Sequence, residues 1–248
     1  MNKLKPLLDR AIPLVAVSFR DDESERLARE AVQAGVDVVE LRVDRYADTD
    51  PEHVLSQVRT FQELPVLATI RSRAEGGEWR GSESQRLALF HSIIDEVDAV
   101  DIELSSTEIN ADVIAAARRH DKVVVVSHHD FDSTPSLDRL EAIADDARAL
   151  GADIVKISTM ASSKHDLRTL ASLTIKLADL GVIVIAMGTV GTIGRVLFPA
   201  LGSCLTFSHM GAGSAPGQLD FFETFGLMRK FYPEFNEQKI RSMQLEDA

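Results

Sequence analysis

A lysine within an apolar segment is the residue of this sequence most suggestive of chemistry. Lys156 lies in the segment 154–157, whose other members are all apolar, so a strand covered on both faces would leave it no solvent-facing side. Desolvation disfavours an ammonium group and lowers a lysine pKa below its usual ~10.4, which makes the amine reactive toward a carbonyl carbon. Schiff-base chemistry at Lys156 is one interpretation. A structural lysine paired with Glu40 or Glu103 is the other, and both stay open here.

Two adjacent histidines follow the preceding apolar segment. Strand alternation sends His128 and His129 to opposite sides, so at most one of them enters a shared site. We expect His129 to be the proton-transfer partner of the lysine, with a hydrogen-bonded structural histidine as an equal alternative. A metal site would need both histidines on one ion, which the alternation disfavours. Asp130 is expected to cap the turn that follows.

Two other segments carry charged residues two positions apart, hence on one face of a strand. Glu40 and Arg42 either pair with each other or reach separate groups of a substrate. Asp101 and Glu103 have the same spacing, and we expect them to be partners of lysine and arginine inside a barrel. These residue types point to a polar interior with both signs of charge.

Three loops add further candidate residues. Arg71 and Glu75 either form a loop salt bridge, or Arg71 binds an anion while Glu75 orients a catalytic histidine. The segment Gly188–Arg195 lacks the lysine of a phosphate loop and the spacing of a dinucleotide site, but Arg195 near a helix start could still hold an anion. The segment Gly211–Gln218 is glycine-rich around Ser214 and is either a mobile lid that supplies hydroxyl-binding groups or a flexible turn.

Short apolar segments that must position these residues alternate with helix-like stretches along the chain. The starts of successive segments lie between 22 and 34 residues apart, close to the roughly 30 residues of one strand-plus-crossover unit. No linker interrupts them, so we predict an α/β fold that is a single-domain (β/α)8 barrel over residues 1–248, with a short tail at 231–248 and with a doubly wound open sheet as the alternative. The ends of barrel strands, where these charges fall, are where such sites lie. The predicted strands are Leu14–Ser18, Val36–Val43, Pro65–Ile70, Ala99–Leu104, Lys122–Ser127, Ala152–Ser158, Val182–Met187 and Cys204–Ser208.

Helix boundaries are marked by capping residues and by glycines. Capping side chains precede expected helices in four places, and three glycines are expected to end helices just before strands. The expected caps are Asp50 before Pro51, Thr134 before Pro135, Ser82 with Gln85, and Ser105 with Glu108, and the glycines are Gly35, Gly151 and Gly181.

Charge and composition exclude several classes of protein. The chain has 27 Lys+Arg and 39 Asp+Glu in 248 residues, a formal net charge of −12, which disfavours a nucleic-acid partner. No apolar segment approaches the ~20 residues that span a membrane, so we expect no membrane partner. The N-terminal segment is interrupted by Pro6 and Pro13 and does not resemble a signal peptide. Cys204 is the single cysteine, which favours a reducing, cytoplasmic location.

Several segments, in chain order and on the expected strands, resemble the type I 3-dehydroquinate dehydratases of the shikimate pathway. The resemblance covers about residues 14–230. It is carried by the segments 40–44, 71–77, 129–131, 156–157, 187–195 and 214–218.

The resemblance implies a (β/α)8 barrel, commonly a homodimer, that uses neither metal nor organic cofactor and takes the small molecule 3-dehydroquinate as its substrate. It implies that Lys156 forms an imine with the C3 ketone and that His129, oriented by Glu75, removes a C2 proton and helps to expel the C1 hydroxyl as water. Arg195 would clamp the substrate carboxylate. The other substrate-binding residues it implies are Glu40, Arg42, Arg71, Met187, Phe207, Ser214, Ala215 and Gln218.

Three alternatives remain at this point. A class I aldolase-like lyase would also use Lys156, but it usually needs a phosphate site. A catalytically silent barrel would serve as a binding or scaffold protein. A metal-dependent hydrolase would have to be built on His129, Asp101 and Glu103.

Overall fold

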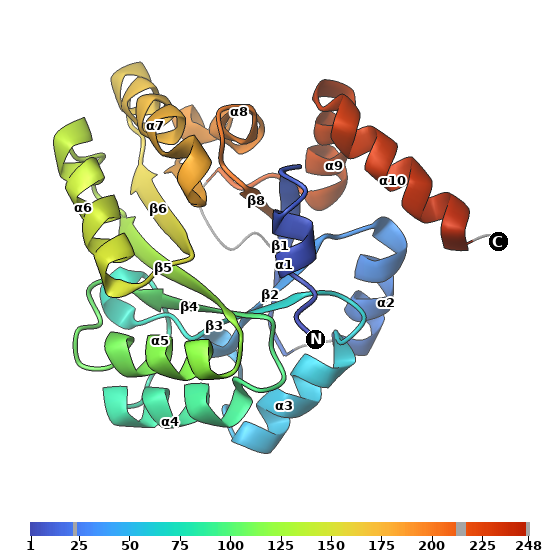
Figure 1. Ribbon diagram of the computed structural model, residues 1–248, viewed down its shortest axis with the longest axis vertical. Helices are drawn as coiled ribbons and strands as arrows, with labels where there is room; N and C mark the ends of the chain where they lie inside the picture. Colours follow the sequence, from blue (N-terminus) through green and yellow to red (C-terminus); the bar gives the residue numbers. More distant parts are fainter. Residues whose placement is uncertain (22–23, 212–216, 247–248) are drawn as a thin grey trace.

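The computed structural model describes residues 1–21, 24–211 and 217–246. Eight parallel strands form one sheet in the order β7-β6-β5-β4-β3-β2-β1-β8. Helices surround this sheet (Figure 1). The strands follow the chain order, and β8 returns beside β1, as in a (β/α)8 barrel. The predicted barrel is therefore confirmed, and the doubly wound open sheet is wrong.

The elements alternate regularly along the chain. The strands are β1 (Leu14–Phe19), β2 (Val38–Arg42), β3 (Val66–Thr69), β4 (Ala99–Glu103), β5 (Val123–Asp130), β6 (Ile154–Met160), β7 (Val182–Met187) and β8 (Leu205–Ser208). The helices are α1 (Lys5–Leu8), α2 (Ser24–Ala34), α3 (Pro51–Thr60), α4 (Glu83–Ile93), α5 (Asn110–Arg119), α6 (Leu137–Leu150), α7 (Lys164–Leu177), α8 (Gly194–Ala200), α9 (Phe221–Phe231) and α10 (Pro233–Glu246).

The barrel is nearly closed, and β7 and β8 form its seam. An isolated bridge joins Val182 to Ser203 there, in place of a full ladder. The backbone N–H of Cys204 donates to the carbonyl oxygen of Val182 at 2.9 Å, and Val184 N–H donates to Ser203 Oγ at 3.2 Å. The Ser203 hydroxyl thus accepts a hydrogen bond that a paired strand would otherwise accept.

Strand alternation divides the buried residues into two layers. Inside the barrel, the lower part is a packed apolar cluster that Leu4, just before α1, helps to fill. Outside, the opposite faces of the strands pack against the helices in a second cluster. Val155 and Ile157 belong to this outer layer, so Lys156 between them faces the inside. The expectation that this lysine has no solvent face is confirmed, because it is 4% exposed.

Half of the predicted helix caps are confirmed. The Asp50 side chain accepts a hydrogen bond from Glu52 N–H at 3.0 Å, and Ser82 forms a reciprocal capping box with Gln85. The three predicted glycines adopt positive φ: 79° at Gly35, 111° at Gly151 and 67° at Gly181. These glycines end helical segments without the steric cost that a side chain would meet.

The other two predicted caps are wrong. Ser136, not Thr134, caps α6, and the Thr134 hydroxyl donates to the carbonyl oxygen of Met160 at 2.7 Å. Helix α5 begins at Asn110 without a side-chain cap, and Ser105 instead donates its hydroxyl hydrogen bond to Glu75. In both cases a partner distant in sequence competes successfully for the hydroxyl.

The predicted tail forms α10, which packs against α9 (red in Figure 1). Lys239 of α10 is buried, and its Nζ lies 2.5 Å from Asp37 Oδ1 and 2.6 Å from the carbonyl oxygen of Gly35. This contact holds the tail against the N-terminal end of β2. Within the described ranges, no helix has the length and apolar character needed to cross a bilayer.

Candidate active site

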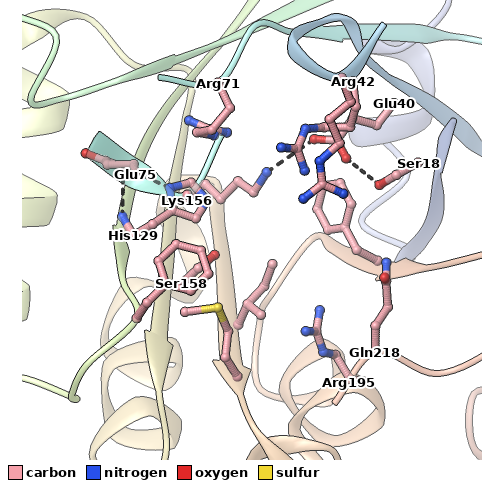
Figure 2. Close-up of a pocket in the computed structure, with 16 residues that line it drawn as sticks. Ser18, Glu40, Arg42, Arg71, Glu75, His129, Lys156, Ser158, Arg195 and Gln218 are labelled. Atoms are coloured by element: carbon pink, nitrogen blue, oxygen red, sulfur yellow. Dashed lines mark hydrogen bonds and ion pairs between the residues drawn. The ribbon is translucent and has the colours of Figure 1, made fainter. Parts of the chain in front are cut away.

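A pocket at the C-terminal ends of the strands collects most of the predicted site residues (Figure 2). The predicted residues that line it are Glu40, Arg42, Arg71, Glu75, His129, Lys156, Met187, Arg195, Phe207 and Gln218. The cationic ones therefore gather at one mouth although the chain is acidic overall. Ser214 and Ala215 lie outside the residues that the structure describes.

Lys156 extends from β6 across the pocket toward Glu40 (Figure 2). Its Nζ lies 2.9 Å from Asp101 Oδ2, 3.5 Å from Glu40 Oε1 and 4.4 Å from the ring centroid of Phe207. The lysine is therefore both buried at the pocket and ion-paired, and its partners are Asp101 and Glu40 rather than Glu103. An ion pair at this position also keeps the amine in one place.

Beneath the pocket lies a buried network of ion pairs. Asp101 Oδ1 lies 2.8 Å from Arg71 Nη2 and accepts a hydrogen bond from Ser127 Oγ at 2.6 Å. Glu103 pairs with Arg71 at 3.0 Å and with Arg86 at 2.9 Å. Burial alone would raise the pKa of Asp101, but Arg71 and Lys156 outweigh it and hold that pKa far below its usual range. The expectation that these acids pair with basic residues is confirmed: Asp101 pairs with a lysine and an arginine, and Glu103 pairs with two arginines.

Glu40 and Arg42 do not pair directly but take separate partners. Arg42 forms two hydrogen bonds with Asp44, at 2.9 and 2.8 Å. Glu40 accepts hydrogen bonds from the hydroxyls of Ser18 and Thr69 and faces Lys156. Burial alone would raise the Glu40 pKa, but Lys156 and Arg42 outweigh it and lower the pKa, so Glu40 remains a carboxylate.

His129 and Glu75 form the second reactive unit of the pocket. Strand β5 runs to Asp130, beyond its predicted end, and the 3-10 helix η2 (Arg73–Glu75) brings Glu75 beside it. Glu75 Oε2 lies 2.9 Å from His129 Nδ1 and accepts the His129 backbone N–H at 2.9 Å, while Ser105 donates to Oε1. His128 is absent from the pocket lining, as the alternation predicted, and Asp130 caps the following turn through the N–H groups of residues 132 and 133.

The hydrogen bonds around Glu75 assign the protonation state of the imidazole. Glu75 accepts from two other donors, so its carboxylate form is best satisfied when His129 Nδ1 also carries a hydrogen. Nε2 is then the nitrogen with a free lone pair, as a general base requires. Burial lowers the His129 pKa well below its usual value, as do the nearby charges of Arg71 and Lys156, so the imidazole is neutral. Burial raises the pKa of Glu75 to about 7.

Arg195 of α8 brings a buried guanidinium group to the side of the pocket opposite His129 and Glu75 (Figure 2). The residue is 3% exposed, and its Nε and Nη2 have no hydrogen-bond partner among the described residues. Burial alone lowers its pKa to about 10, which leaves the group charged at neutral pH. A buried cation of this kind is suited to an anion that the protein itself does not supply.

Sequence reasoning missed six residues that line the pocket. Two of them could have been found from the period-two pattern, because Ser18 continues the inward series of β1 and Ser158 lies two residues after Lys156. Ile185 was part of a predicted strand but was not singled out. The remaining three lie beyond the strand ends, where no period-two signal exists: Arg45 ends the 3-10 helix η1 (Val43–Arg45), and Gly76 and Phe131 lie in loops.

Two observations on the described residues concern the alternative of a metal-dependent hydrolase. Among them, no three His, Cys, Asp or Glu side chains lie close enough together to hold an ion. Asp101 and Glu103, the carboxylates expected in a metal-dependent hydrolase, are instead bonded to arginine and lysine.

A (β/α)8 barrel with a buried lysine and a histidine–carboxylate pair at its C-terminal mouth defines a class of barrel enzyme built for chemistry on a carbonyl group. The family model for Type I 3-dehydroquinase matches residues 11–230. The chain belongs to the type I 3-dehydroquinase family.

Individual relatives agree with this assignment. A 3-dehydroquinate dehydratase from Methanosarcina barkeri is 37% identical over 227 residues, which cover 87% of this chain and 93% of that protein. One from Methanosarcina acetivorans is 36% identical, covering 92% and 98%. The crystal structure of 3-dehydroquinate dehydratase from Geobacillus kaustophilus aligns with a TM-score of 0.83 at 30% identity, covering 89% of this chain and 92% of that one.

Proposed function

We propose that this protein is a 3-dehydroquinate dehydratase, a hydro-lyase that eliminates water from 3-dehydroquinate to give 3-dehydroshikimate. The observation that carries the proposal is that one pocket holds a buried lysine amine and, across from it, a buried guanidinium, two of whose nitrogens have no hydrogen-bond partner among the described residues. The amine suits the substrate's ketone, and the guanidinium suits its carboxylate. The family and the relatives' names support the same activity.

The first step is imine formation at Lys156. The amine adds to the C3 carbonyl carbon, and loss of water gives a protonated imine. The Lys156 ammonium gives a proton to His129, which passes it to the carbonyl oxygen as the amine adds. His129 then takes a second proton from the attached nitrogen and gives it to the same oxygen, which leaves as water while the nitrogen keeps its last proton. Asp101 and Glu40 lie beside Nζ and stabilise the positive charge that the protonated imine retains.

The second step is elimination. The protonated imine withdraws electrons from C2, so His129 Nε2 removes a C2 proton and an enamine forms. The enamine electrons then expel the C1 hydroxyl, which takes a proton from His129 and leaves as water. Glu75 holds His129 in the required orientation through Nδ1. Hydrolysis of the product imine releases 3-dehydroshikimate and restores Lys156.

The other pocket residues bind and enclose the substrate. Arg195 clamps the carboxylate, and Met187 and Phe207 form apolar walls. Glu40, Arg71 and Gln218 bind ring hydroxyls, with Arg42 supporting them from β2. We predict that Ser214 and Ala215, which lie outside the described residues, also contact the substrate.

We also infer that the protein is a homodimer and acts in the cytoplasm. Ile193, Leu197, Phe222 and Phe231 are large apolar side chains exposed on or beside α8 and α9, two helices that pack together. A second copy covering them would remove this apolar surface from water. The single cysteine supports a reducing location. Sedimentation velocity at several concentrations tests the dimer.

One assay tests the proposed activity directly. Adding 3-dehydroquinate should produce the ultraviolet absorbance of a conjugated enone acid, and borohydride added during turnover should attach ligand mass to Lys156. A phosphorylated ketose should give neither signal, whereas cleavage of that ketose would favour a class I aldolase-like lyase. Turnover of dehydroquinate without any adduct would contradict the imine mechanism.

A further inference from the structure

Ser158 is a buried hydroxyl group on the pocket wall that has no hydrogen-bond partner in the part of the chain that the structure describes. It lies on β6, is 2% exposed and lines the same pocket as Lys156 and His129. Its Oγ makes no hydrogen bond to any of the described residues. A buried hydroxyl is normally paired, so this group is expected to find its partner in what the pocket contains.

Other hydroxyls of the barrel interior differ from Ser158 in this respect. Ser18 donates to Glu40, and Ser127 donates to Asp101. Thr69 donates to Glu40 at 2.9 Å. Each of these hydroxyls supports a carboxylate of the ion-pair network, whereas Ser158 supports no protein group among those described. Its role therefore differs from that of holding the network together.

Ser158 is a neighbour of both reactive residues on the barrel wall. It follows Lys156 by two residues, so both face the barrel interior, about 7 Å apart along the strand. Across the ladder its Cα is the direct partner of His129. Figure 2 shows the Ser158 side chain below His129, on the same side of the pocket. A small molecule bound to Ser158 Oγ would thus have the imidazole next to it and the Lys156 chain beside it.

We propose that Ser158 Oγ binds the water molecule that hydrolyses the imine at Lys156. The inference rests on the proposed function, because only an imine mechanism consumes water at this carbon. Water fits the site because it can donate to His129 while it accepts from Ser158, which satisfies the serine and aims the water oxygen at the imine carbon.

The step balances with the groups present. The water oxygen forms a bond to the imine carbon, the C=N π electrons move to nitrogen, and His129 Nε2 takes a water proton. The imidazolium then protonates the carbinolamine nitrogen. The C–N bond breaks as the hydroxyl oxygen forms the carbonyl and returns its proton to His129. That proton finally passes to the free amine, so protonated imine and water become ketone and the Lys156 ammonium beside Asp101.

The test measures how fast the Lys156 adduct forms when the protein is given the product, 3-dehydroshikimate. Protein is mixed with 3-dehydroshikimate, reduced with borohydride at increasing times, and the mass of the protein is measured. In Ser158→Ala we expect the adduct to form about tenfold more slowly, because the water loses one hydrogen bond. The final adduct level should stay near that of the unchanged protein. By microscopic reversibility, imine formation and hydrolysis slow together.

Two further variants separate this role from others. Ser158→Thr keeps the hydroxyl and should restore most of the rate, and Ser92→Ala, on the exposed side of α4, should behave as the unchanged protein. An unaltered rate of adduct formation in Ser158→Ala would overturn the proposal. A rise in KM alone would also overturn it, because that result is expected if the serine binds a substrate hydroxyl rather than a water molecule. Absence of any adduct in the unchanged protein, together with no turnover of 3-dehydroquinate, would instead reject the proposed function itself.

Discussion

One oxygen of Glu75 holds His129 at two points. Oε2 of Glu75 lies 2.9 Å from the backbone nitrogen of His129 and 2.9 Å from its Nδ1. The carboxylate therefore fixes the main chain and the ring of the same residue, and Nε2 is left for the pocket. This relationship makes the charge state of Glu75 decisive for the proposed base.

The pH dependence of activity should show this control. Burial raises the pKa of Glu75 to about 7, so the carboxylate takes a proton as the pH falls through that value and competes with Nδ1–H for the same oxygen. The pKa of His129 is well below 6.5, so the imidazole does not titrate in this range. We expect kcat to fall below about pH 7. A kcat profile shows this directly, and Glu75→Gln should lose that limb of the profile.

Ser105 should set the position of this limb. Its hydroxyl donates to Glu75 and lowers the Glu75 pKa, so Ser105→Ala raises that pKa further. The limb should move to higher pH by about one unit, the size of one hydrogen bond. The kcat profile of Ser105→Ala is compared with that of Ser92→Ala, which should not move. A shift to lower pH would contradict the assigned hydrogen bond.

Lys156 should contribute to both chemistry and stability, and two substitutions separate the contributions. Lys156→Ala removes the amine, leaves Glu40 without the Lys156 ion pair and leaves Asp101 paired with Arg71, so the free energy of unfolding should fall by about 3 kcal/mol. Lys156→Arg keeps a cation without a nucleophilic amine and should retain much of that stability. Neither protein should gain mass with dehydroquinate and borohydride. Denaturant unfolding and intact mass measure the two effects, and an adduct on Lys156→Arg would place the nucleophile elsewhere.

Arg195 should favour binding of the substrate and lower the stability of the ligand-free protein. Two nitrogens of its buried guanidinium have no hydrogen-bond partner among the described residues. Arg195→Met should therefore leave the ligand-free protein equally stable or more stable. The same change removes charge-assisted hydrogen bonds to the carboxylate, so KM for dehydroquinate should rise about 100-fold. Steady-state kinetics and thermal unfolding check the two directions. Arg119→Met, on the exposed end of α5, is the matched control, and equal KM values in both variants would remove Arg195 from the binding site.

Period-two and strand-plus-crossover patterns predicted the eight strands and the inward direction of the reactive residues, and the pairing of β8 with β1 then decided between a barrel and an open sheet. The eight apolar segments appear as eight strands in chain order. Lys156, His129, Glu40 and Arg42 all line the pocket, as alternation along each strand required. These features are local properties of the backbone, so neighbours in sequence suffice to predict them.

Tertiary structure decided which charges meet. From the sequence, Glu40 and Glu103 were the candidate partners of Lys156. In the structure Asp101 lies nearest to the amine, and Glu103 forms ion pairs with two arginines instead. The stagger of strands around a barrel sets these pairings, and no single strand contains that information. The gathering of cations at the mouth of an acidic protein has the same origin.

The wrongly predicted caps illustrate the same division. Ser105 had the spacing of a capping box with Glu108, but Glu75, brought close by another loop, takes its hydroxyl hydrogen bond. A buried carboxylate needs donors more than an exposed helix start needs a cap, because water can solvate the helix start but not the carboxylate. The sequence by itself therefore predicted most of the residues that line the pocket, but not all of them. Only the folded chain decided that Glu75 holds His129 and that Arg195 keeps buried nitrogens without a partner among the described residues.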